Sequence, residues 1–232
     1  MPDSDRRSIV DASLLSFVAG FVDTCVFVGL FGLFTAHVTG NLALIGAQLV
    51  HHDGEVLAKL LSIPAFVSAV VIAVHLAHLL KRRGRQRIAP LLCLEAIMLL
   101  MSVATAAMFG PDVHADDALP VVAGLLAAGA MGLQNALMRI ELASLPATTV
   151  MTVNVTQVVI DAVIVASRAG DPAVTTRERE ESERRFARMW PPVSTFVVGA
   201  ACGAGGYAWI RMWSLCVPAA LCILLAVRFA RR

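Results

Sequence analysis

The residues of this chain that are best suited to bind a solute form polar interruptions within an almost unbroken apolar region. The first interruption, residues 34–41, reads FTAHVTGN, and the second, residues 148–154, reads TTVMTVN. Hydroxyl and amide side chains can hydrogen-bond a polar solute, and a glycine lets a ligand approach the backbone closely. Each interruption opens an apolar segment too short for an ordinary transmembrane helix. We therefore predict two broken helices that face each other near the middle of a membrane.

The starts of two such helices could together form a binding site. A helix that begins inside a bilayer leaves its first N–H groups without intrahelical partners, and its dipole favours an anionic group there. The expected ligand is thus a small anionic or strongly dipolar solute. The predicted solute-binding residues lie in the two breaks and in the span before the second one: Thr39, Gly40, Asn41, Thr152, Asn154 and Asn135. The alternative is that Thr39 and Asn41 only satisfy backbone groups in a kinked bundle that transports nothing.

Three ionisable residues in apolar surroundings are candidates for proton coupling. Asp23 lies well inside the first span, where a carboxylate is costly and usually faces a partner or a water-filled cavity. We hypothesise that Asp23 couples a proton-linked cycle with His37 as partner or relay, because an imidazole changes charge near neutral pH. Asp161, deep in the second short segment, is the next candidate. The alternative is that Asp23 and His37 are hydrogen-bonded structural residues.

Other ionisable residues indicate neither an enzyme nor a metal site. His75 and His78 have no third or fourth ligand nearby, and the five cysteines form no CxxC pair. No phosphate loop, HExxH motif or recognisable Ser-His-Asp order is present, so we expect no enzyme activity, cofactor or bound metal. A net charge of +2 does not indicate a nucleic-acid partner. Glu95, one turn into a span, is expected to pair with Arg87 or Arg85.

The composition defines the fold class that must position these residues. Hydrophobic residues make up 58% of the chain and charged residues 16%, which lies outside the usual range of soluble domains. The predicted fold is an all-α polytopic membrane protein forming a single domain over residues 1–232, because lipid-exposed backbone must be satisfied within each segment. Six spans are expected, at about 12–32, 60–80, 89–109, 119–138, 193–210 and 214–229.

The distribution of lysine and arginine decides between two topologies. If the short segments 39–50 and 153–166 each crossed the membrane, the basic clusters 81–87 and 167–191 would lie on opposite sides. If each segment enters and returns on one side, the basic clusters face the cytoplasm and the acidic loop 110–118 faces outside. We therefore predict six transmembrane helices, two short re-entrant helices and cytoplasmic termini.

The two halves of the chain, about 9–110 and about 118–230, also resemble each other. The matching pairs are Gly20 and Gly132, Asp23 and Asn135, Thr39 and Thr152, Asn41 and Asn154, Gln48 and Asp161, and Pro64 and Pro192. Each half holds three spans, an odd number, so the second half is inverted relative to the first. Broken segments at corresponding positions of inverted halves indicate a transporter-type site at the bilayer midplane. The alternative is a chance recurrence of short apolar motifs.

Three motifs, at residues 20–23 (GFVD), 37–41 (HVTGN) and 132–135 (GLQN), resemble the YoaK family of small bacterial inner-membrane proteins. The resemblance covers nearly the whole chain, from about residue 9 to 230. That family is of unknown function, so the resemblance implies the fold and a location in the bacterial inner membrane and names no substrate. Its second motif usually has threonine-glycine where this chain has Thr152-Val153, which argues against a binding role for the second motif.

The sequence favours a small secondary transporter of an anionic or polar solute, with protons as the candidate coupling ion. The second hypothesis is a non-transporting membrane scaffold that acts through the charged loop 167–191, and a channel is the third. The basic cluster 81–87 is expected to attract anionic membrane lipids. Helix faces rich in small residues could form a homodimer contact.

Overall fold

The computed structural model describes residues 3–51, 56–143, 145–146, 148–149, 151–167 and 175–231, with side chains from Arg6 onward. Its elements are α1 (Asp3–Gly29), α2 (Val38–His51), α3 (Leu57–Arg82), α4 (Ile88–Ala106), α5 (Ala118–Ile140), α6 (Met151–Ala166), α7 (Thr176–Ile210), the 3-10 turn η1 (Arg211–Leu215) and α8 (Cys216–Ala230). Across these ranges no β-strand occurs, so the predicted all-α class is confirmed.

Five helical segments of the described chain are long and apolar enough to cross a membrane. They are Arg6–Gly29, Leu57–Arg82, Ile88–Ala106, Ala118–Ile140 and Thr176–Ala230. The last segment has 55 residues and contains α7, η1 and α8. By helix length and hydropathy, the chain is therefore a multi-pass membrane protein.

α7 corrects one boundary that the sequence suggested. The pattern separates a charged helix within 167–191 from a span that begins at about residue 193, but α7 runs through both as one helix of 35 residues. Pro191 and Pro192 lie inside it, where the charged half meets the apolar half. Two consecutive prolines remove the N–H groups of only one turn, so the helix continues through them. The Thr195 hydroxyl also donates a hydrogen bond to the Pro191 carbonyl at 2.9 Å.

The tightest helix contacts form where glycines let two backbones meet. In the α1–α7 contact, a Cβ atom added to Gly20, Gly199 or Gly203 would lie 2.2–2.3 Å from a backbone oxygen of the facing helix. In the α3–α5 contact, a Cβ atom on Gly132 would lie 2.7 Å from the Phe66 carbonyl oxygen. Small residues permit such close packing in membranes, where lipid supplies little driving force between helices.

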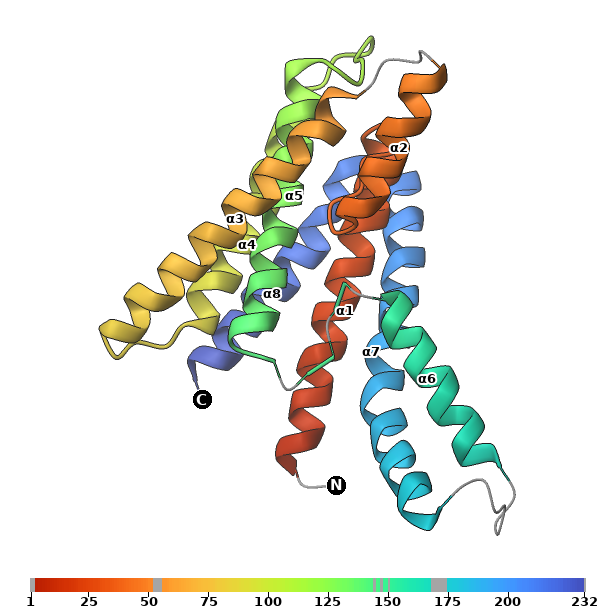
Figure 1. Ribbon diagram of the computed structural model, residues 1–232. Helices are drawn as coiled ribbons and strands as arrows, with labels where there is room; N and C mark the ends of the chain where they lie inside the picture. Colours follow the sequence, from red (N-terminus) through yellow and green to blue (C-terminus); the bar gives the residue numbers. More distant parts are fainter. Residues whose placement is uncertain are drawn as a thin grey trace.

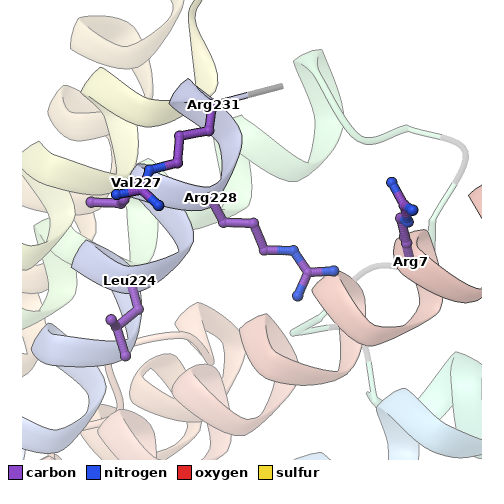
Figure 2. A pocket seen from close by; sticks show the side chains of 5 residues that line it. All are labelled: Arg7, Leu224, Val227, Arg228 and Arg231. Carbon is purple, nitrogen blue, oxygen red and sulfur yellow. The ribbon is translucent and has the colours of Figure 1, made fainter.

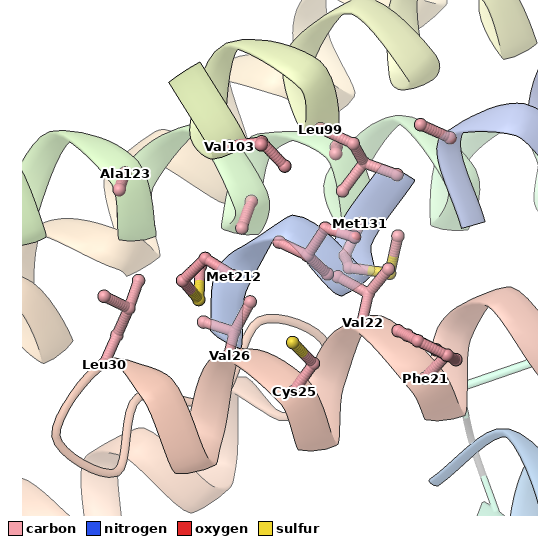
Figure 3. Close-up of a cluster of buried hydrophobic side chains, with 14 of the residues drawn as sticks. Phe21, Val22, Cys25, Val26, Leu30, Leu99, Val103, Ala123, Met131 and Met212 are labelled. Carbon is pink, nitrogen blue, oxygen red and sulfur yellow. The ribbon is translucent and has the colours of Figure 1, made fainter. Parts of the chain in front are cut away.

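A cluster of buried apolar side chains holds α1, α4, α5 and η1 together (Figure 3). It includes Val22 of α1, Leu99 of α4, Met131 of α5 and Met212 of η1. This core fixes the separation of α1 and α5, which are the helices that precede the two polar breaks.

The two short helices point in opposite directions (Figure 1). α2 begins near the middle of the molecule's long dimension and runs to its upper end in this view, whereas α6 begins near the middle and runs to the lower end. With 14 and 16 residues, each helix is roughly 20–25 Å long at about 1.5 Å per residue. The starts of both helices are thus internal to the molecule.

We expect Gly203→Ala to destabilise the protein by about 1–3 kcal/mol, because the new methyl group would overlap the Phe21 carbonyl. Gly205→Ala on the same helix is the matched control, since no atom lies within 4 Å of its added Cβ. Thermal unfolding of the purified protein in detergent measures both variants. Equal melting temperatures for the two variants would contradict the backbone contact.

Candidate functional site

The first break follows α1 and is fixed by buried polar contacts. After Gly29, the backbone turns through Phe31 and Gly32, which have φ angles of 53° and 76°. The ammonium group of Lys59, buried in α3, donates to the Phe31 carbonyl at 2.8 Å. The positive charge of Lys59 interacts favourably with the partial negative charge at the C-terminal end of α1, and the hydrogen bond holds the turn in place.

Asp23 organises the residues between α1 and α2. Its Oδ1 atom accepts hydrogen bonds from the Thr35 N–H (2.8 Å), the Thr35 hydroxyl (3.0 Å) and the Ala36 N–H (2.9 Å). Its Oδ2 atom lies 2.7 Å from Nδ1 of His37. The two backbone N–H groups can only donate, so Oδ1 is an acceptor in both of these bonds. Asp23 therefore ties the first break to α1.

Asn41 secures the same break from the α2 side. Its side-chain oxygen accepts from the Phe34 N–H at 2.9 Å, and its amide nitrogen donates to the Phe34 carbonyl at 2.7 Å and to the Ser62 hydroxyl at 2.9 Å. At Gly40, an added Cβ would lie 2.9 Å from the Phe34 ring. Both residues thus serve the packing around Phe34, although the sequence suggests that they contact a solute.

The second break is tied to α5 by two neighbouring amide side chains. Asn135 accepts a hydrogen bond from the Thr149 hydroxyl, and its own amide donates to the Met131 carbonyl at 2.8 Å. Gln134 donates to the Thr148 hydroxyl at 3.0 Å and also to the Leu15 carbonyl of α1 at 2.9 Å. Gln134 therefore links α1, α5 and the second break.

The two breaks meet at a cavity of about 310 Å³. Its lining residues come from both breaks and from α5: Ala36, His37, Val38, Thr39, Asn135, Thr149, Met151 and Thr152. Thr39, Asn135 and Thr152 are thus brought together here, as is His37. The other predicted solute-binding residues, Gly40, Asn41 and Asn154, do not line the cavity.

Two helix N-terminal ends place partial positive charge at this cavity. α2 begins at Val38 and α6 at Met151, so the N-terminal ends of both helices open on it. The His37 carbonyl accepts the first α2 bond, from the Asn41 N–H at 3.2 Å, which leaves the preceding N–H groups of this turn without intrahelical acceptors. Among the described lining residues no carboxylate occurs, and His37 is the side chain that can gain a charge. Such a cavity favours an anionic group.

His37 connects the cavity to Asp23. The histidine side chain is 35% exposed, whereas that of Asp23 is 6% exposed and lies behind it. The imidazole also contacts the rings of Phe34 and Phe196, with centroids 5.6 and 6.4 Å away. These contacts orient one ring nitrogen toward Asp23 and leave part of the ring accessible from the cavity.

Asp161 lies away from the cavity, in the contact between α6 and α7. It is fully buried and pairs with Arg185, whose Nη2 atom is 2.8 Å from Oδ1. Nη2 also bonds the Ser182 hydroxyl at 2.9 Å. One further arginine, Arg179, donates to the Ser167 carbonyl and to the Val165 carbonyl at the end of α6. The structure thus gives the predicted coupling residue Asp161 an ion pair that fastens α6 to α7.

The prediction that Glu95 pairs with Arg87 or Arg85 is wrong. Arg87 pairs instead with Glu141 at 2.9 Å, whereas Glu95 is fully buried in α4 and lies against Cys222 of α8. Sequence reasoning also missed Gln134 and Ser62, which tether the breaks. An amide or hydroxyl on an apolar helix indicates a hydrogen bond but not its distant partner.

These features define a polytopic all-α membrane protein with a polar cavity between two interrupted helices. The chain belongs to the DUF1275 family, a family of proteins of unknown function, which it matches over residues 12–228. The match includes both breaks and all the helices that line the cavity. No curated protein and no solved structure matches the chain.

We expect Arg185→Gln to destabilise the protein by about 2 kcal/mol or more, because it leaves the Asp161 carboxylate buried without its cation. Arg184→Gln is the control: Arg184 pairs with Glu180 at the surface, where such pairs contribute about 0–1 kcal/mol. A double-mutant cycle with Asp161→Asn, followed by thermal unfolding, measures the coupling. Additive effects of the two changes would argue against the ion pair.

Proposed function

We propose that this protein is a small secondary transporter that carries a small anionic or polar solute through the cavity between the two breaks. The observation that carries the proposal is that the starts of α2 and α6 line the same cavity. Discontinuous helices whose N-terminal ends converge on one site are the usual way in which transporters bind anionic groups within a membrane.

We further propose that residues 9–110 and 118–230 are inverted halves of a YoaK-like inner-membrane protein. Equivalent contacts on the two sides support this. Asp23 and Asn135 each hold the break that follows its own helix. Gly20 and Gly132 each lie against a backbone carbonyl in the opposite half.

The proposed topology has six spans, with α2 and α6 as re-entrant helices. η1 divides the last apolar segment, so α7 and α8 count as two crossings. The opposite directions of α2 and α6 support re-entry from opposite faces (Figure 1). The basic loop between α3 and α4 lies toward the same end as both chain termini, and basic residues favour a cytoplasmic location for that end.

A small anion is the proposed solute class. The helix ends supply partial positive charge, and the hydroxyls of Thr39 and Thr152 supply donors from opposite halves. The carboxylate of Asp23 is already surrounded by donors from the first break and by His37. It therefore does not present a bare negative charge that would repel an anion.

Proton coupling is proposed to act through His37, with Asp23 as its fixed counter-charge. In this mechanism His37 is protonated when the solute binds and loses the proton as the solute leaves. The glycine-packed pairs α1–α7 and α3–α5 would rock against each other around the cavity. The competing scaffold function requires no cavity chemistry and depends on the charged part of α7.

The binding test is a thermal-shift screen of the purified protein against small inorganic and organic anions. For an anion that raises the melting temperature, Thr39→Val and Thr152→Val should each weaken binding about tenfold, because each removes a hydroxyl worth about 1.4 kcal/mol. Thr156→Val on exposed α6 surface is the control and should bind normally. If an anion binds to the purified protein but is not taken up by liposomes that contain the protein, the result would favour the scaffold function.

The coupling test measures the affinity for such an anion between pH 5 and 8. We expect tighter binding at lower pH, since a protonated His37 adds positive charge beside the anion. His37→Gln should abolish this dependence, and Asp23→Asn should weaken it by removing the counter-charge. His78→Gln, outside the cavity, should leave the profile unchanged. A wild-type pH profile in Asp23→Asn would refute the proposed coupling.

A further inference from the structure

A second polar cleft lies where α1 begins and α8 ends. It has a volume of about 510 Å³ and is lined by Arg7 of α1 and by Leu224, Val227, Arg228 and Arg231 of the C-terminal part (Figure 2). None of these residues contributes to the cavity between the breaks. The cleft is therefore a separate feature of the molecule.

The positive charges around this cleft have few acidic partners among the side chains that the structure describes. Arg228 extends toward α1 and pairs with the buried Asp11, whose Oδ1 atom lies 3.3 Å from its Nε atom (Figure 2). Among the side chains that the structure describes, no carboxylate forms an ion pair with Arg7 or Arg231. Among the described side chains, three guanidinium groups thus surround the cleft with one partner carboxylate, so the cleft attracts an anion.

The apolar wall of the cleft continues toward the middle of α8. Leu224 and Val227 lie one turn apart and are 64% and 44% exposed. α8 is apolar up to Val227, and its basic residues begin with Arg228. This change from apolar to basic residues along one helix marks the level of a membrane surface.

We propose that this cleft binds an anionic phospholipid, with the headgroup held by the arginines that line the cleft and an acyl chain along Leu224 and Val227. The planar guanidinium fork matches the oxygen geometry of a phosphate. Basic pockets between transmembrane helices are known to hold anionic headgroups. A free phosphate would use the arginines alone, whereas a lipid also uses the exposed apolar wall. This inference does not depend on the proposed transport function.

The test measures phosphatidylglycerol binding to the full-length, delipidated protein in neutral detergent by native mass spectrometry. Arg7→Gln/Arg231→Gln should weaken binding about tenfold or more, since two charge-assisted contacts are lost. Arg177→Gln/Arg184→Gln removes the same charge from the exposed charged part of α7, outside the cleft, and should leave binding unchanged. Equal weakening in both double variants would overturn the proposal in favour of diffuse surface attraction.

Binding of further ligands tests whether the cleft recognises the intact lipid or only its phosphate group. Phosphatidylcholine, which is zwitterionic, should bind more weakly than phosphatidylglycerol, and Leu224→Gln should reduce lipid binding while Arg7 and Arg231 remain. If inorganic phosphate or water-soluble glycerophosphoglycerol binds as tightly as the intact lipid, the cleft is a phosphate site and the lipid assignment is wrong. Unchanged melting temperatures of the variants without lipid would verify that they fold.

Discussion

Backbone that leaves a helix inside an apolar bundle must find hydrogen-bond partners, and Asp23 supplies them for the first break. Its carboxylate holds the backbone of Thr35 and Ala36, while Asn41 holds both backbone groups of Phe34. Without these contacts the interruption would leave polar groups unpaired at a cost of about 1–3 kcal/mol each. At the first break, side chains from the helices on either side thus take over the hydrogen bonding that a continuous helix would provide internally.

The same residues combine structural and chemical roles. Asp23 stabilises the break and also contacts His37, the one described side chain in the cavity lining that can gain charge. In the second half, the amide of Asn135 stabilises the break through Thr149 but cannot carry a charge. Both breaks are therefore held by a polar side chain of the preceding helix, but they differ in charge. Only the first can respond to pH through these residues.

The periodicity and polarity of the sequence suffice to predict the helical class, the two breaks and their meeting at one cavity. Thr39 and Thr152 are found together because helix starts inside an apolar bundle bring their first polar side chains to the same level, and Asn135 joins them from within α5. The inward roles of Asn41 and Gly40 could not be predicted, since they depend on where the Phe34 ring packs. The same applies to Asp161 and Arg185, which are 24 residues apart and meet only because α6 and α7 fold back on each other. Glu95 faces α8 because of the rotation of α4, which the spacing of the basic residues does not reveal.

The unbroken length of α7 has a mechanical consequence. At about 1.5 Å per residue, its 35 residues form a rod roughly 50 Å long. The charged end of α7 is bonded to α6 through Arg179 and Arg185. Its apolar half packs closely against α1 at Gly199 and Gly203. A tilt of the charged end would therefore displace α6 and α1 together. The start of α6 and the first break, which Asp23 ties to α1, would then move as one unit relative to Asn135 of α5 on the cavity wall.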